Sequence, residues 1–200
     1  MAQRKLACVG LLLFGLCFGA KAELRVTAIA TGDIHNLVLA SDGTVWAWGA
    51  NNRGQLGDGT RMTSQTPVLV SGLAGIVAIA AGHQHSVALK ADGTVWVWGA
   101  SRYEISADDR LTPVQVNGLT TVRTIAAAYD HCLALKIDGT VWWWGVNWRH
   151  DVLDRSTPIE VAGLTAVAAI ATGYASNLAL KPDGTVWAWG GNYWGQLGDG

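Results

Sequence analysis

The chain has 200 residues, a formal net charge of −1 and eleven tryptophans. A charge this close to neutral gives no electrostatic reason to expect nucleic acid or anionic lipid as a partner. Each tryptophan can bury about 150–250 Å² of surface, so this composition predicts a core that depends heavily on indole rings.

Residues 1–22 are predicted to be a secretory signal peptide. Arg4 and Lys5 give the charged start, residues 6–20 form the apolar run, and Ala-Lys-Ala provides the small residues for cleavage after Ala22. The apolar run is too short to be read first as a membrane span. We therefore expect a secreted or periplasmic protein with no stable membrane insertion after cleavage; an uncleaved anchor is the alternative.

Cleavage would change both the charge and the cysteine content. It would leave 11 basic residues against 15 acidic ones, a net charge of −4. Cys8 and Cys17 would be removed, so Cys132 would stand alone and could form no intramolecular disulfide. The exported domain is therefore expected to depend on its core for stability.

The remaining chain, residues 23–200, is repetitive. The sequence DGTVWxWG occurs four times, and successive copies start 50, 46 and 45 residues apart. A nearly fixed period of this size indicates one structural unit repeated, each copy burying its apolar face against the next. The repeats are assigned to residues 26–75, 76–121, 122–166 and, incomplete, 167–200.

Each repeat predicts four strands, which the first repeat illustrates in chain order. An apolar stretch ends in Ala-Thr-Gly at residues 29–32, and an alternating run follows at 35–39. Asp42-Gly43 then favours a two-residue type I′ hairpin turn, in which both residues have positive φ. Residues 44–49 form the returning strand with both tryptophans on one face, and residues 66–70 form a short fourth strand that contains proline.

Four antiparallel strands in about 45 residues describe a blade of a β-propeller. We therefore predict an all-β fold with about 3.5–4 four-stranded blades. A helical solenoid is a poor alternative because the mature chain shows no 3.6-residue period. A β-sandwich is a weaker alternative because it does not require such close repetition.

The repeat pattern I-A-x-G-x-x-H-[SN]-x-A-L-K-x-D-G-T-V-W-x-W-G-x-N-x-x-G-Q-L-G-D-G-T resembles that of the regulator of chromosome condensation (RCC1) family. GQLGDG is present at Gly54–Gly59 and Gly195–Gly200, whereas residues 104–109 and 150–155 depart from it. The resemblance implies a propeller usually of seven blades. We therefore expect a partial or truncated propeller; a half-ring completed by a second copy is the alternative.

In an up-and-down meander, the turn after Ala-x-Gly and the loop after Trp-x-Trp-Gly emerge at one end of the blade, and the Asp-Gly turn emerges at the other. The first end carries the variable residues, including exposed aromatic and arginine side chains typical of protein-binding hot spots. The candidate partner-binding residues are Arg53, His83, Arg102, Tyr103, Tyr129, Trp148, Arg149, Tyr174, Tyr193 and Trp194. The alternative is that these side chains fold back over neighbouring blades.

We therefore predict a secreted module that binds a protein partner. The pattern resembles the bacterial secreted type represented by beta-lactamase inhibitor protein II, which implies an aromatic binding face but does not identify the partner. Guanine-nucleotide exchange on a small GTPase is an alternative that the family resemblance implies, although an export signal argues against it. Carbohydrate binding at the cell surface is another, because tryptophan and tyrosine also stack on sugars.

No pattern predicts an enzyme, a metal site or a cofactor. His35, His85 and His131 occupy one repeat position, one in each blade, whereas metal ligands must converge. We expect these histidines to hydrogen-bond the backbone within their own blades. Cys132 and His131 are adjacent on a strand and point to opposite faces, so they are not expected to form a nucleophilic pair.

Overall fold

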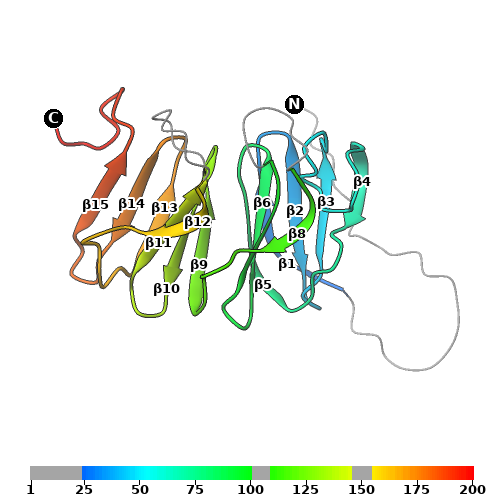
Figure 1. Cartoon of the computed structure of the whole chain (residues 1–200), viewed down its shortest axis with the longest axis horizontal. Helices are drawn as coiled ribbons and strands as arrows, with labels where there is room; N and C mark the ends of the chain where they lie inside the picture. Colours follow the sequence, from blue (N-terminus) through cyan, green and yellow to red (C-terminus); the bar gives the residue numbers. More distant parts are fainter. Residues whose placement is uncertain (1–23, 101–108, 146–154) are drawn as a thin grey trace, which may run out of the picture.

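The computed structural model describes residues 24–100, 109–145 and 155–200. Within these residues, fifteen β-strands form four separate antiparallel sheets, and every sheet is a meander in which neighbouring strands follow chain order. The sheets stand side by side in chain order (Figure 1). The prediction of an all-β fold made of propeller blades is confirmed.

The first three sheets have four strands each and the fourth has three. The first sheet contains β1 (Val26–Thr31), β2 (His35–Ala40), β3 (Val45–Gly49) and β4 (Ser64–Leu69), and the second contains β5 (Ile76–Ala81), β6 (His85–Lys90), β7 (Val95–Gly99) and β8 (Arg110–Gln115). The third sheet contains β9 (Val122–Ala127), β10 (His131–Lys136), β11 (Val141–Gly145) and β12 (Arg155–Glu160), and the fourth contains β13 (Ala169–Thr172), β14 (Ser176–Leu180) and β15 (Val186–Gly190).

The hairpin between β2 and β3 differs from the predicted turn. Gly43 has a φ of +80°, but Asp42 is not among the residues with positive φ, and the Gly43 N–H donates to the Ala40 carbonyl. This is a three-residue loop with glycine in the left-handed position, so the prediction of a two-residue type I′ turn is wrong. Asp42 is nevertheless a turn former: its Oδ1 accepts hydrogen bonds from the Thr44 N–H at 3.0 Å and the Thr44 hydroxyl at 2.6 Å.

The core lies between the sheets, because every sheet presents different faces to its two neighbours. In the second sheet, Trp96 pairs with Ala88 and Trp98 pairs with Ser86 across the ladder. Trp98 is fully buried in the cluster shared with the first sheet. On the opposite face, Val87 belongs to the cluster shared with the third sheet. The two-residue alternation of β7 therefore places its tryptophans against the preceding sheet and aliphatic side chains against the following one. In β11 the same holds for Trp142 and Trp144, whereas Trp143 packs against the following sheet.

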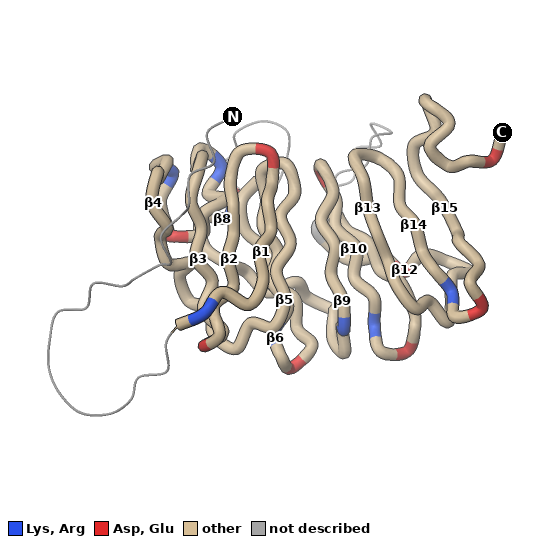
Figure 2. The backbone as a smooth tube through the Cα atoms, turned by 180° about the vertical axis from the view of Figure 1, so that it is seen from behind, with Lys and Arg blue, Asp and Glu red and all other residues tan. Residues whose placement is uncertain are grey.

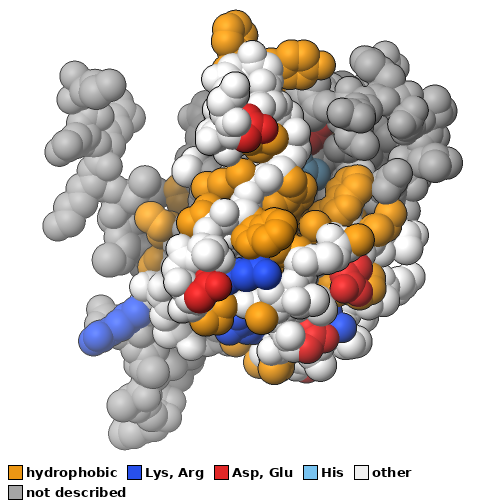
Figure 3. Space-filling view, turned by 90° about the vertical axis from the view of Figure 1, so that its left-hand side faces the viewer, with side chains coloured by type: hydrophobic (Ala, Val, Ile, Leu, Met, Phe, Trp, Pro, Cys, Tyr) orange, Lys and Arg blue, Asp and Glu red, His pale blue; other side chains and the backbone are white. Residues whose placement is uncertain are grey.

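The fourth sheet has an uncovered face among the described residues. Leu178, Leu180 and Val186, which are 42%, 41% and 61% exposed, lie where the earlier sheets contact a following sheet. Figure 3 shows hydrophobic side chains gathered on this side of the molecule. Among the described residues, no helix is long and apolar enough to cross a membrane.

Candidate protein-binding surface

Four turns, one from each sheet, lie together at the end opposite the Asp-Gly turns, which are at the lower end in Figure 2. Each turn joins the first strand of its sheet to the second and begins directly after the Ala-x-Gly segment or its equivalent. The next residue in each repeat is Asp33, His83, Tyr129 or Tyr174. We call these four residues the turn row.

The side chains of the turn row contact one another in chain order. His83 Nε2 lies 3.5 Å from Asp33 Oδ2. The His83 and Tyr129 rings are stacked, with centroids 4.1 Å apart and an interplanar angle of 12°. Tyr129 and Tyr174 have centroids 4.4 Å apart and are tilted by 46°. The structure thus brings together three of the predicted site residues and adds Asp33, which the sequence analysis did not select.

An open groove of about 250 Å³ lies along the turn row. It is lined by residues 31–33, 81–83, 127–129 and 172–174, and none of these is lysine or arginine. The Asp33 side chain is 54% exposed. Behind Tyr129, the Asp130 side chain is only 7% exposed: its Oδ1 lies 3.1 Å from His131 Nδ1, and its Oδ2 has no hydrogen-bond partner among the described residues.

The surroundings of Tyr129 are both desolvated and negative. Burial is the main cause that raises the pKa of Tyr129, and Tyr174, Asp33 and Asp130 raise it further. All of these causes disfavour a negative charge on the phenol. The groove therefore presents aromatic rings beside carboxylates, a combination that favours a cationic group over an anionic one.

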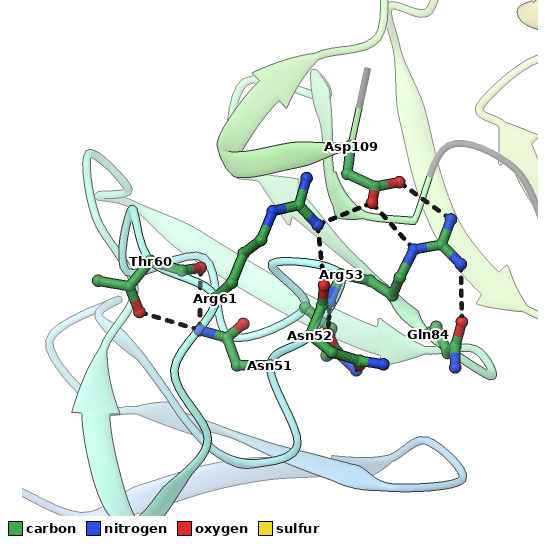
Figure 4. A network of polar contacts seen from close by, with 8 residues as sticks. Asn51, Asn52, Arg53, Thr60, Arg61, Gln84 and Asp109 are labelled. Atoms are coloured by element: carbon green, nitrogen blue, oxygen red, sulfur yellow. Dashed lines mark hydrogen bonds and ion pairs between the residues drawn. The ribbon is translucent and has the colours of Figure 1, made fainter. Parts of the chain in front are cut away.

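Arg53 does not belong to this surface. The residue is only 1% exposed, so the expectation of an exposed arginine is wrong here. Its Nε and Nη2 donate to Asp109 Oδ2 and Oδ1 at 2.9 and 3.0 Å, and its Nη1 donates to Gln84 Oε1 at 3.1 Å (Figure 4). Arg61 Nη1 donates to the same Asp109 Oδ2 at 3.0 Å. Arg53 joins the loop after β3 to the second sheet and has a structural role.

Tyr193 and Trp194 are strongly exposed, at 88% and 91%. They lie in the loop after β15, where the Trp194 N–H donates to Gln196 Oε1 at 2.8 Å. In the first repeat the Arg53 N–H donates to Gln55 Oε1, also at 2.8 Å. Trp194 therefore occupies the position that Arg53 occupies in the first repeat.

This equivalence gives the exposure of Trp194 a different interpretation. At the same loop position, the side chain of Arg53 is buried against the following sheet. No following sheet lies beside Trp194 among the described residues. Its exposure therefore does not by itself indicate a binding surface. The other four candidates, Arg102, Tyr103, Trp148 and Arg149, lie outside the described residues.

The repeated histidines have partners that the sequence analysis did not identify. His35 Nε2 lies 2.9 Å from Ser86 Oγ, and His131 Nε2 lies 2.7 Å from Asn177 Oδ1. Each bond joins one sheet to the next, so the expectation that the side chains bond backbone within their own blades is wrong. An alignment of the repeats could have identified these partners, because each partner residue directly follows the histidine position in the next repeat.

At the junction between the second and third sheets, His85 Nε2 lies 3.2 Å from Cys132 Sγ. The sequence analysis considered Cys132 only with its neighbour His131, whereas the partner is 47 residues away. Burial raises the pKa of Cys132, and burial together with nearby histidines lowers that of His85 to about 3. Both shifts oppose a thiolate–imidazolium pair, so this contact is a neutral hydrogen bond between sheets. No group of three or more potential metal ligands occurs in the described part of the chain.

Comparison with known families and proteins gives similarity along most of the chain. A family model described as "Regulator of chromosome condensation (RCC1) repeat" matches residues 42–89, and a second model of that description matches residues 26–55, 76–104 and 167–196. Over 51 residues the chain is 51% identical to the E3 ubiquitin-protein ligase HERC2 of Homo sapiens, covering 26% of this chain and 1% of HERC2. Over 59 residues it is 36% identical to human Protein RCC2, covering 28% of this chain and 11% of RCC2.

Solved structures show the same arrangement of sheets. Human WBSCR16 matches with a TM-score of 0.75 and 26% identity over 87% of this chain and 50% of that one. Prp20p from Saccharomyces cerevisiae matches with a TM-score of 0.69 and 22% identity over 85% of this chain and 46% of that one. The chain therefore spans about half the length of these solved proteins and a much smaller share of the two curated ones.

Proposed function

Because this chain belongs to the RCC1 repeat family, we propose that it is a protein-interaction module that binds a partner protein through the end of the sheets that carries the turn row. The observation that carries the proposal is the turn row itself. Four sheets contribute one side chain each to a continuous surface, and three of the four are aromatic rings in contact. Tyr174 is 55% exposed, and tyrosine is among the residues that dominate protein-binding hot spots.

The solved relatives support a role in binding at the level of the fold. The structure of Prp20p is described together with its binding to Gsp1p and histones, and another structure shows yeast RCC1 (Prp20) bound to Kap60. A fold hosts many functions, so the choice of surface on this chain depends on its own residues. These are His83, Tyr129 and Tyr174 in the turn row, and Tyr193 and Trp194 in the loop after β15. The proposal keeps Arg102, Tyr103, Trp148 and Arg149 as candidates from the sequence pattern, although they lie outside the described residues.

The experiment compares two aromatic truncations in a partner-binding assay. Immobilised protein captures partners from the periplasm or culture fluid, and affinity is then measured for the captured protein. We expect Tyr174→Ala to weaken binding by about 2 kcal/mol or more, which is about 30-fold, because a hot-spot ring is lost. Trp187→Ala is the matched control: it removes a half-exposed ring from β15, outside the turn row.

Two results would reject the proposed surface. One is unchanged affinity in both Tyr174→Ala and Tyr129→Ala. The other is an equal loss in Trp187→Ala, which would indicate a general defect of the fourth sheet. Binding that is confined to glycans on an array would instead support the carbohydrate alternative.

We also propose that the module is exported and acts by binding rather than by catalysis, in the manner of the bacterial secreted type. The basis is the N-terminal pattern of two basic residues, an apolar run and an Ala-Lys-Ala site. N-terminal sequencing of protein recovered from the periplasm or culture fluid is expected to begin at Glu23. Recovery of an intact N-terminus in the membrane fraction would support the uncleaved anchor.

A further inference from the structure

The groove along the turn row has a floor of closely approaching backbone. A Cβ atom on Gly32 would lie 2.3 Å from the Gly82 carbonyl oxygen, and one on Gly82 would lie 2.4 Å from the Ala128 carbonyl oxygen. Such separations exclude any side chain at either glycine without a shift of the backbone. Successive turns can therefore stack closely, and the side chains that follow them form the groove wall.

Asp33 supplies the carboxylate at the exposed end of this wall, and His83, 3.5 Å away, is the one basic side chain among the lining residues. Asp33 is half exposed, and no lysine or arginine lines the groove. Asp130 adds a second carboxylate behind Tyr129, with one oxygen buried and without a hydrogen-bond partner among the described residues. A cation that enters the groove therefore meets a carboxylate, and no lining lysine or arginine repels it.

The arrangement of the rings favours a planar cation. His83 and Tyr129 are close to parallel, and Tyr174 continues the row with more than half of its surface exposed. A planar guanidinium can stack on an aromatic ring and still donate two hydrogen bonds to a carboxylate. A lysine ammonium is not planar, so it cannot stack in this way, and it does not present two parallel N–H donors to a carboxylate.

We propose that the groove receives an arginine side chain of the partner protein, with its guanidinium stacked on the aromatic rings of the turn row and hydrogen-bonded to Asp33. This inference rests on the proposed function, because it specifies the chemistry of a protein partner at the same surface. The arginine side chain approaches along the turns, and its alkyl portion contacts Tyr174.

The test uses the whole chain and three capped peptides: acetyl-Gly-Arg-Gly-amide and its analogues with citrulline or lysine in place of arginine. Citrulline keeps the shape of arginine and removes its charge. Binding is followed by NMR titration of the tyrosine ring resonances. We expect the arginine peptide to shift the Tyr129 and Tyr174 resonances and to bind about tenfold more tightly than the citrulline and lysine peptides, a difference of about 1.4 kcal/mol.

Two charge-neutral variants of the protein complete the test. Asp33→Asn removes the groove carboxylate and is expected to weaken the arginine peptide about tenfold. Asp42→Asn is the matched control, because it removes the same charge from an Asp-Gly turn at the opposite end and should leave affinity unchanged. Both variants should keep the tryptophan fluorescence of the folded chain.

Three outcomes would overturn the inference: no ring shift with the arginine peptide, equal affinity for the citrulline or lysine peptide, or equal effects of Asp33→Asn and Asp42→Asn. The partner-capture experiment distinguishes a failure of the arginine inference from a failure of the proposed function. A partner that depends on Tyr174 but not on Asp33 would leave the binding surface standing and reject arginine as its ligand. A normal peptide response with no captured partner would count against the proposed function alone.

Discussion

The burial of Arg53 indicates that this side chain stabilises the fold and is not available to contact a partner protein. Its guanidinium donates to both carboxylate oxygens of Asp109, and the two side chains are 2% and 0% exposed. Gln84 accepts a further hydrogen bond. A pair removed this far from water is costly to break on one side, because the buried Asp109 carboxylate would lose two charge-assisted hydrogen bonds and keep the one from Arg61.

We therefore expect Arg53→Ala to lower the free energy of unfolding by about 3–5 kcal/mol, measured by urea denaturation. Arg61→Ala is the control, because Arg61 donates to the same Asp109 carboxylate but its side chain is 34% exposed. An exposed pair contributes about 1 kcal/mol or less, so the loss in Arg61→Ala should be much smaller. Equal losses in the two variants would contradict the distinction between them.

Sequence reasoning could find the position of Arg53 in its loop but not its partner. Asp109 lies 56 residues away, within a segment that departs from the repeat pattern, so alignment of the repeats gives no reason to pair the two. A contact of this kind depends on how two sheets are placed in space. The sequence pattern therefore wrongly included Arg53 among the exposed candidate residues.

At the scale of the strands, a hydrogen bond from one histidine joins each pair of neighbouring sheets. The histidine begins the second strand of its sheet, and its Nε2 contacts a hydroxyl, a thiol or an amide oxygen of the next sheet. Burial lowers the pKa of His35 to about 4 and that of His85 to about 3, with smaller contributions from neighbouring histidines. These two side chains are neutral in the folded protein at neutral pH.

The depressed pKa values predict a loss of stability on mild acidification. Between pH 6.5 and about 4, the unfolded chain binds protons at His35 and His85 that the folded chain does not, so the free energy of unfolding decreases as pH falls. The slope is at most about 1.4 kcal/mol per pH unit for each histidine. Urea denaturation at several pH values between 7.5 and 4.5 measures it.

The double variant His35→Asn and His85→Asn provides the control for this slope. It cannot take up these two protons, so its stability should depend less on pH in the same window, even though it starts lower. The turn aspartates do not account for the slope, because hydrogen bonds with the following threonines lower their pKa below 3.8. A wild-type stability that is constant down to pH 4.5 would contradict the expectation.

The strands themselves were predictable because their signal is local. The alternation of Trp46 and Trp48 with Val45 and Ala47 identifies a strand with both tryptophans on one face, and Asp42-Gly43 marks the hairpin. The turn type was not predictable from Asp-Gly alone. The loop also includes Ser41, and Gly43 alone takes the left-handed conformation.

For the molecule as a whole, the uncovered face of the fourth sheet has a physical consequence. Leu178, Leu180 and Val186 form an apolar surface on a sheet that ends at an open β15 edge among the described strands. Exposed apolar sheet faces and open edges promote association. We expect the 200-residue chain to self-associate in a concentration-dependent manner, which sedimentation velocity measures.

Paired charges on this face should reverse the association. The double variant Leu178→Glu and Val186→Lys is expected to sediment as a smaller species and to keep its free energy of unfolding within about 0.5 kcal/mol, because both positions are exposed. Met62→Lys is the control, since it replaces an exposed apolar side chain on a loop of the first sheet. Association that is unchanged in the double variant would show that a different surface is responsible.

At this scale the sequence predicted which end of the sheets carries variable residues, because a meander alternates its turns. It did not predict that His83, Tyr129 and Tyr174 contact one another, since this depends on the spacing between sheets. Asp33 was missed because the selection favoured aromatic and arginine residues, although Asp33 occupies the same repeat position.

The different faces of each sheet give the whole row a direction. The tryptophans of the second sheet and Trp142 and Trp144 of the third face the preceding sheet, whereas Trp143 packs toward the following one, so a second row that continues this packing would join head to tail. Contacts of this type are heterologous, and their repetition either closes a circle or continues into a fibre. Any sheet that joins the row with this polarity would place its own turn beside Tyr174, and the turn row would grow by one residue.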